Sequence, residues 1–158
     1  MPEGSVIRIC ICPDKGEPMI YASSVDVLAY KGIVGDRYAV GRGAFSRSKP
    51  PKVRDVSLIA MAAIEAANQE VAVPFTYLDT RRNFVVDLGI EDLNELIDKE
   101  FMVGNARMRG VWRCDPCERP SMLSGKPDFA TAFKDRGGLR AQVLNDGEIT
   151  VGDPIVMI

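Results

Sequence analysis

Two cysteines stand three positions apart in the stretch Arg113-Cys114-Asp115-Pro116-Cys117-Glu118-Arg119-Pro120. The thiolate is the form of cysteine that acts as nucleophile and metal ligand, and neighbouring cationic side chains favour it. Arginines flank the pair, and proline restricts the loop backbone. Because proline disfavours the α conformation in the residue before it, we expect no long helix directly after this loop. The stretch predicts a site of sulfur chemistry.

The Cys114–Cys117 pair allows four interpretations. A thioredoxin-type redox pair needs the first cysteine at a helix N-terminus, and the segment 118–120 argues against such a helix. A structural zinc site needs four nitrogen or sulfur ligands, which here would have to include Cys10 and Cys12, two residues more simply read as small buried apolar side chains. The third interpretation is two inert cysteines on a turn. The fourth, which we favour, is a reactive thiolate that serves a soft metal or sulfur chemistry.

Composition sets outer limits on the function. The 158 residues are 46% hydrophobic and 27% charged, which indicates one globular domain spanning residues 1–158. The net charge of −2 argues against nucleic acid as a partner, and the chain has no histidine, which excludes histidine-dependent triads. No apolar run approaches the roughly 20 residues that span a bilayer, and the start lacks the pattern of a secretory signal. We therefore expect a cytoplasmic protein without a membrane partner; its oligomeric state is left open.

Two further segments carry arginines in unusual settings. Residues 32–43 hold four glycines and include Gly35-Asp36-Arg37, so the segment is either a turn-rich barrel corner or a loop that brings Arg37 and backbone amides to an anionic ligand. Arg81-Arg82-Asn83 precedes an apolar strand. These arginines form either a surface ion-pairing group or a planar fork that recognises phosphate.

The hydrophobic pattern predicts many short strands and few helices. Alternation and glycine-marked turns favour a mainly β fold, a closed or nearly closed β-barrel with a few short helices, and a β-meander at the C-terminus. Strands are expected at 6–12, 19–27, 53–59, 84–86, 101–103, 106–112, 139–144, 148–151 and 155–158, and helices at 60–70, 89–97 and 128–135.

A series of these segments, taken in order, resembles the MOSC domain, found at the C-terminus of molybdenum cofactor sulfurases and in amidoxime-reducing components. The small stand-alone bacterial members look most similar. The resemblance runs from about residue 6 to 158. It is carried by Gly35-Asp36-Arg37, by 81–86, by Phe101-Met102-Val103-Gly104-Asn105-Ala106, by Cys114-Asp115-Pro116-Cys117, by Gly138-Leu139-Arg140-Ala141, by Asp146-Gly147-Glu148-Ile149 and by Val151-Gly152-Asp153.

The resemblance implies a barrel that binds the molybdenum cofactor (molybdopterin), a pterin dithiolene with a phosphate tail, and that works without pyridoxal phosphate. Cys117 matches the cysteine that ligates molybdenum, with Cys114 as the alternative. Arg81 and Asn83 match an Arg-x-Asn signature, and Gly35, Asp36 and Arg37 match the Gly-Asp-Arg motif. The resemblance, together with the charge of the ligand, implies a cationic cofactor pocket built from Arg37, Arg81, Arg82, Arg113 and Arg140.

The implied catalytic activity is the two-electron reduction of a small N-hydroxylated substrate. The electrons would come from a separate redox partner protein, because the sequence contains no flavin or iron–sulfur motif. One alternative is a non-catalytic carrier that holds sulfur as a persulfide on Cys117 or shuttles the cofactor, and another is an interaction module that has lost its cofactor. Tyr38 stands where stand-alone members often have histidine, so any proton delivery by that histidine would fall to Tyr38.

Overall fold

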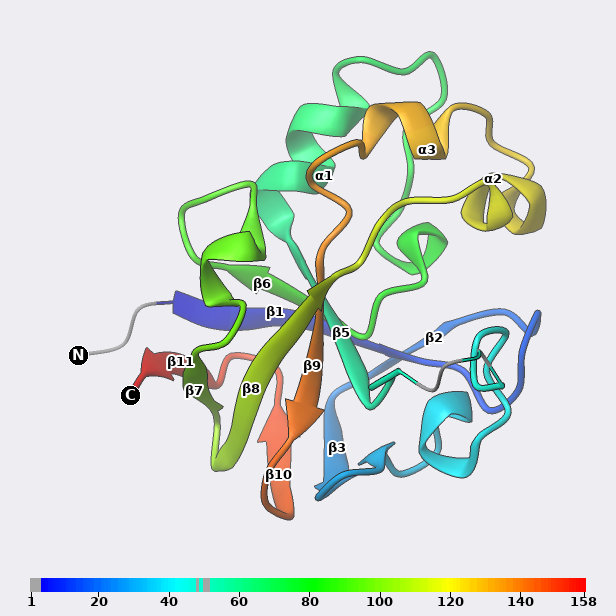
Figure 1. Ribbon diagram of the computed structural model, residues 1–158. Coiled ribbons are helices and arrows are strands. Elements are labelled where there is room, and N and C mark those ends of the chain that lie inside the picture. Colours follow the sequence, from blue (N-terminus) through cyan, green and yellow to red (C-terminus); the bar gives the residue numbers. More distant parts are fainter. Residues whose placement is uncertain (1–3, 48, 50–51) are drawn as a thin grey trace.

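The computed structural model describes residues 4–47, 49 and 52–158, and its centre is a closed β-barrel (Figure 1). Strands pair in the order β11-β7-β8-β9-β5-β6-β1, and β11 pairs with β1 to close the ring of seven. β2 extends this sheet beyond β1, and β10, β3 and β4 form a second sheet. The strands are β1 (Gly4–Ile11), β2 (Ile20–Ala22), β3 (Ser24–Leu28), β4 (Gly32–Ile33), β5 (Val56–Ala60), β6 (Phe84–Asp87), β7 (Glu100–Val103), β8 (Ala106–Arg113), β9 (Leu139–Val143), β10 (Gly147–Thr150) and β11 (Pro154–Met157).

The barrel contains one parallel pair, β5 with β6. A closed ring with an odd number of strands cannot alternate direction throughout, so at least one neighbouring pair must run parallel. A parallel pair needs a crossover connection, and here the segment between β5 and β6 contains α1 and η2. The helices are η1 (Arg37–Val40), α1 (Met61–Asn68), η2 (Leu78–Thr80), η3 (Leu93–Leu96), α2 (Arg119–Ser124) and α3 (Phe129–Ala132).

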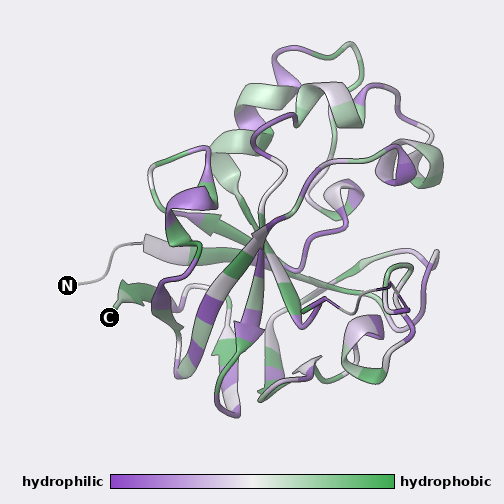
Figure 2. Cartoon of the chain, in the orientation of Figure 1, coloured by the Kyte–Doolittle hydropathy of each residue, from purple (hydrophilic) through white to green (hydrophobic). Residues whose placement is uncertain are grey.

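Two hydrophobic clusters stabilise the fold. The larger cluster fills the barrel with alternate side chains of its strands, among them Leu58, Phe84 and Met108. Buried and exposed residues alternate along most of β8, and Figure 2 shows hydrophobic and hydrophilic residues alternating along the same strand. The smaller cluster joins the outer face of β5 and β6 to α1 and α3, where the rings of Phe129 and Phe133 stack at 4.4 Å and Phe75 meets Phe129 edge-on at 5.3 Å.

The predicted mainly β barrel is confirmed, but the chain path through it differs from the prediction in one respect. The C-terminal strands do not form a meander. β9 pairs with β5 and β8, β10 pairs with β3, and β11 pairs with β1 and β7. Turn signals locate strand ends but do not say which strands become neighbours. That choice is made by long-range pairing.

The structure differs from or adds to the prediction in three local features. In β1 a bulge between Val6 and Arg8 interrupts the alternation, so that Val6 and Ile9 face the barrel core together. The segment expected to be helical at 89–97 contains only the 3-10 turn η3. As expected, no long helix follows the cysteine loop: α2 begins at Arg119 and has six residues. Pro120 occupies the first turn of α2, where the missing N–H has no intrahelical partner to lose.

No helix among the described residues is long and apolar enough to cross a membrane.

Candidate functional site

A cavity of about 420 Å³ opens where β8 ends and the cysteine loop begins. Its size falls in the range typical of small-molecule sites, roughly 300–1,000 Å³. The side chains around it come from the segment before β5, from the residues ahead of β6, from β8, from the cysteine loop and from β9. The lining residues are Phe45, Lys52, Arg54, Arg82, Trp112, Arg113, Cys114, Asp115, Cys117 and Arg140.

The cavity is strongly cationic in a protein whose net charge is −2. Five of its lining residues are lysine or arginine, and one, Asp115, is acidic. Asp115 lies 3.8 Å from Arg113, which also pairs with Asp135 at 3.0 Å at the exposed rim. The concave surface therefore suits an anionic ligand, because walls of low dielectric strengthen the field of the lining charges.

Both loop cysteines line this cavity, but they differ in exposure. Cys114 is buried, and its backbone N–H donates to the Gly138 carbonyl at 2.9 Å, which extends the pairing of β8 with β9 into the loop. Cys117 is exposed. Gly137 has no room for a side chain, since a Cβ there would lie 2.4 Å from the Cys114 carbonyl oxygen. Close backbone packing thus fixes Cys114, while the thiol of Cys117 is open to solvent and ligands.

Arg82 is a buried strut that ties the cysteine loop to the barrel. Its guanidinium donates to three backbone carbonyls: Gly137 at 2.8 Å, Thr80 at 3.2 Å and Cys114 at 3.3 Å. The guanidinium also lies 5.7 Å from the Phe129 ring centroid. Most of the donor capacity of Arg82 is therefore used within the protein, although the residue reaches the cavity wall as predicted.

Arg54 and Arg140 differ from Arg82 in the state of their Nε atoms. The Nε atom of each is buried, and neither has a hydrogen-bond partner among the described residues. Burial first, and then the charge of Arg140, lower the pKa of Arg54. Burial acts to lower the pKa of Arg140 as well, but the nearby Cys114 thiol and Tyr38 phenol outweigh it and the net shift is upward. Arginine stays protonated under all such shifts, so the cavity holds two adjacent cations, of which Arg140 is buried and Arg54 half-buried.

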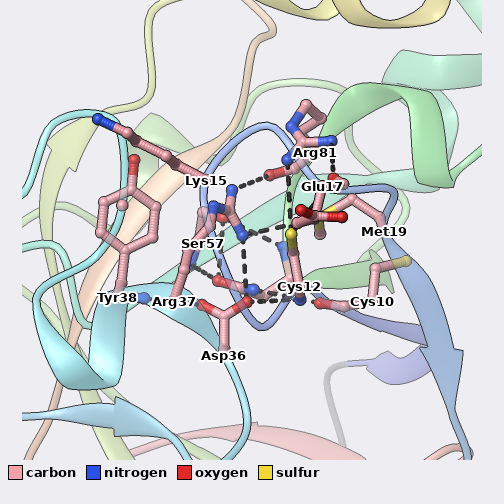
Figure 3. A network of polar contacts seen from close by, with 12 residues as sticks. Cys10, Cys12, Lys15, Glu17, Met19, Asp36, Arg37, Tyr38, Ser57 and Arg81 are labelled. Atoms are coloured by element: carbon pink, nitrogen blue, oxygen red, sulfur yellow. Dashed lines mark hydrogen bonds and ion pairs between the residues drawn. The ribbon is translucent and has the colours of Figure 1, made fainter.

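Arg37 lies in a second network, with Asp36, Cys12 and Arg81 (Figure 3). Asp36 caps η1, because its Oδ2 accepts from the Tyr38 N–H at 3.4 Å. Its Oδ1 accepts from the Cys12 N–H at 2.9 Å and from Arg37 Nη1 at 3.1 Å. Cζ of Arg37 lies 4.8 Å from the Tyr38 ring centroid and Cζ of Arg140 lies 4.9 Å from it. Gly35, with φ +94°, makes the turn that delivers Asp36 to this position. Arg37 itself does not line the cavity, and Tyr38, the residue after the Gly-Asp-Arg motif, contacts the lining residue Arg140.

Arg81 and Asn83, which follow η2, also contact protein groups. Arg81 Nη1 donates to the Glu17 carbonyl at 2.9 Å, and Nη2 lies 3.7 Å from the Cys12 sulfur (Figure 3). Asn83 accepts from the Ser57 N–H at 3.0 Å and donates to the Cys10 carbonyl at 3.1 Å. Of the residues predicted for the cofactor, Cys114, Cys117, Arg82, Arg113 and Arg140 meet at the cavity. Gly35, Asp36, Arg37, Arg81 and Asn83 do not line it.

Several cavity residues were not singled out by sequence patterns. Lys52 and Arg54 lie two positions apart just ahead of β5. Phe45 and Trp112 are half-exposed aromatic side chains that also line the cavity. Two cationic residues before a strand resemble an ordinary solvated edge, so their place in the cavity lining becomes visible only in the folded barrel.

The structure bears on one of the other interpretations of the cysteines, the zinc site. No group of three or more cysteine, aspartate or glutamate side chains that could hold a metal occurs within residues 4–47, 49 and 52–158, so the four-cysteine zinc site is not assembled. Cys10 is buried, and burial raises the pKa of its thiol to about 12. Cys10 and Cys12 pack with Met19, away from the cavity.

The fold and site are those of a closed β-barrel with an exposed thiol in a cationic cavity. Comparison with known proteins shows the family to which this chain belongs. The family model described as MOSC domain matches residues 33–156, and the chain therefore belongs to the MOSC domain family. Among solved structures, the YuaD protein from Bacillus subtilis is 19% identical with a TM-score of 0.77 over 96% of this chain and 93% of that one.

Two further structures share the fold. YiiM from Geobacillus stearothermophilus is 15% identical with a TM-score of 0.70, covering 98% of this chain and 75% of that one. YiiM from Escherichia coli is 18% identical with a TM-score of 0.65, covering 96% and 70%. A comparison with curated proteins gave no match. At these identities the structural likeness concerns the fold.

Proposed function

We propose that this protein binds the molybdenum cofactor in the 420 Å³ cavity and reduces small N-hydroxylated compounds there. The observation that carries the proposal is the meeting of an exposed thiol, Cys117, with a group of cationic side chains in a chain of the MOSC family. A thiolate is a suitable ligand for a soft, sulfur-coordinated metal. The cationic wall complements a cofactor that carries a phosphate and other anionic groups.

The residues present fit such a group. Two buried guanidinium nitrogens at the cavity, on Arg54 and Arg140, lack acceptors, and an anionic ligand would supply them. Cys117 is the proposed metal ligand because its side chain is free to turn toward a bound group. Cys114 is the alternative, and it is held in place by its backbone bonds and by Arg82. When bound, the cofactor supplies two-electron redox chemistry.

The protein's own groups bind and orient the substrate and exclude bulk water from it. Reduction of an N-hydroxyl group breaks the N–O bond, consumes two electrons and two protons, and leaves an amine and water. The chain has no histidine to deliver protons, so we assign this role to solvent entering the cavity mouth and to Tyr38, which lies beside Arg140. The electrons come from a separate redox protein.

Metal analysis tests this function. Protein produced in a host that makes the molybdenum cofactor should carry molybdenum, and Cys117→Ala should lose most of it. Cys10→Ala removes a thiol that lies outside the cavity and should leave the molybdenum content unchanged. Absence of molybdenum from the wild type, or equal loading of the wild type and Cys117→Ala, contradicts the proposal.

The exposure of Cys117 also favours a second function, a carrier that holds sulfur as a persulfide. An exposed thiol can be reached by a donor or acceptor protein, whereas Cys10, Cys12 and Cys114 are buried. Cyanide-labile sulfur detected on Cys117 by mass spectrometry, without reduction of N-hydroxylated substrates, would select this function.

A further inference from the structure

We propose that Arg54 and Arg140 form an oxyanion seat that recognises a phosphate monoester by itself, without help from the thiols or from a metal. The inference deepens the proposed function, on which it rests for the identity of the cavity. It assigns the anion-binding part of the cavity to two residues, one of which sequence patterns did not single out. The ligand chemistry is a tetrahedral dianion.

The hydrogen bonding of the Arg54 and Arg140 side chains is incomplete. Arg54 Nε and Arg140 Nε are the buried side-chain nitrogen or oxygen atoms that lack a partner in the described part of the chain. Buried polar atoms in native proteins nearly always have a partner, and those without one need an explanation. Both residues line the same cavity, and Arg140 is only 7% exposed. A ligand with several acceptor oxygens would satisfy both.

The charges of the two guanidinium groups also favour an anionic ligand. Within the described residues, no carboxylate lies at ion-pair distance from either guanidinium, although Arg37, Arg107, Arg109, Arg113 and Arg136 all have one. Burial lowers the pKa of Arg54, and the nearby charge of Arg140 lowers it further. Placing two cations together without a counter-charge costs stability. A bound dianion would remove that cost.

Aromatic rings orient the two side chains. The Arg140 guanidinium lies 4.9 Å from the Tyr38 ring centroid, and the Arg54 guanidinium lies 5.2 Å from the Phe45 ring centroid. An aromatic face orients a guanidinium by cation–π attraction without neutralising its charge as a carboxylate would. Both forks therefore stay fully charged and pre-positioned. A planar fork matches the paired oxygens of a phosphate group.

The phosphate could come from two sources, the tail of the cofactor or a phosphorylated substrate. The two share the same chemistry, and cofactor-loaded protein separates them. If the cofactor tail occupies the seat, loaded protein will not bind added phosphate, whereas cofactor-free protein will. If a substrate phosphate occupies it, both forms will bind.

The test uses isothermal titration calorimetry of the full chain, free of cofactor, with inorganic phosphate and with a simple phosphate monoester as probes. We expect Arg54→Gln and Arg140→Gln each to weaken phosphate binding at least tenfold. Arg107→Gln is the matched control, since Arg107 is an exposed residue of β8 that pairs with Glu100 and lies away from the cavity. It should leave the dissociation constant unchanged.

Circular dichroism and thermal unfolding would show whether each variant is folded. If Arg140→Gln does not fold, the half-buried Arg54→Gln carries the test alone. Wild-type protein that does not bind phosphate, or folded variants that bind it as wild type does, would overturn the proposal. Molybdenum loading is a separate measurement. Phosphate binding without molybdenum would retain the oxyanion seat and refute the proposed cofactor. Molybdenum loading without phosphate binding would retain the cofactor and refute the seat.

Discussion

Asn83 offers the sharpest test of which predicted residues support the site instead of lining it. The residue is 1% exposed, and its side chain joins two strands: Oδ1 accepts from the N–H and hydroxyl of Ser57 in β5, and Nδ2 donates to the Cys10 carbonyl in β1. Asn83→Asp keeps the size and the acceptor but replaces the donor by an oxygen. The new carboxylate would face the Cys10 carbonyl across the former 3.1 Å hydrogen bond.

The cost can be estimated from these contacts. A lost hydrogen bond that leaves a buried acceptor unsatisfied costs about 1–3 kcal/mol. Burying an unpaired charge adds several kcal/mol unless the group becomes protonated. We therefore expect Asn83→Asp to lower the free energy of unfolding by about 3–5 kcal/mol at pH 7. With a urea m-value of about 2 kcal/mol/M, the midpoint would fall by roughly 2 M.

Urea unfolding followed by circular dichroism measures this shift. Asn94→Asp is the matched control, because Asn94 is a partly exposed residue of η3 and the same charge is added there. We expect it to change the free energy of unfolding by less than about 0.5 kcal/mol. Equal midpoints for the two variants would show that Asn83 does not stabilise the barrel, and would return it to the predicted role in cofactor binding.

The pH dependence provides a second check on the same variant. Burial should raise the folded-state pKa of the introduced carboxyl above its unfolded value of about 4. The folded state then binds the proton more tightly, so the destabilisation is smallest below about pH 4 and grows as pH rises through the folded-state pKa. A deficit that does not vary with pH would mean that the carboxylate is not buried against the Cys10 carbonyl.

Three further predictions follow from the structure. Of the four thiols, we expect Cys117 alone to react rapidly with Ellman's reagent under native conditions, while Cys10, whose pKa burial raises to about 12, reacts only on unfolding; a fast thiol that persists in Cys117→Ser would contradict this. Arg82→Met removes three hydrogen bonds to backbone carbonyls and should cost about 3–5 kcal/mol of unfolding free energy, against about 0–1 kcal/mol for the exposed Arg113→Ala, and equal urea midpoints would refute the strut role. Burial raises the pKa of Asp55 from its usual 3.8, so its ionisation costs stability as pH rises above that value; Asp55→Asn keeps an acceptor for the Val143 N–H and should flatten the pH profile of the thermal midpoint, and an unchanged slope would exclude Asp55 as its source.

The membership of the MOSC family and the barrel class could be predicted from the sequence because both depend on local signals. Glycine-marked turns and alternating apolar residues set the number and approximate ends of most strands. The pair Cys114 and Cys117 was also visible, since the reactivity of cysteine is a property of residue type and near neighbours. The C-terminal meander was predicted wrongly, because local signals contain no information about which strands pair.

The composition of the cavity was decided by the tertiary structure. Arg37, Arg81 and Arg82 look alike in the sequence, yet Arg37 pairs with Asp36, Arg81 reaches the Cys12 loop, and Arg82 supports the cysteine loop from beneath. Arg54 has no distinctive sequence signal, but the barrel places it beside Arg140 without an acceptor for its Nε.

The sequence by itself thus determined the family, the barrel and the thiol pair, because turn chemistry, side-chain alternation and cysteine reactivity act over a few residues. Only the tertiary structure decided which cations remain unpaired around that thiol. The reason is physical: whether a guanidinium is free to bind a ligand depends on the acceptors and rings brought to it by strands distant in the chain, and closure of the barrel fixes those neighbours.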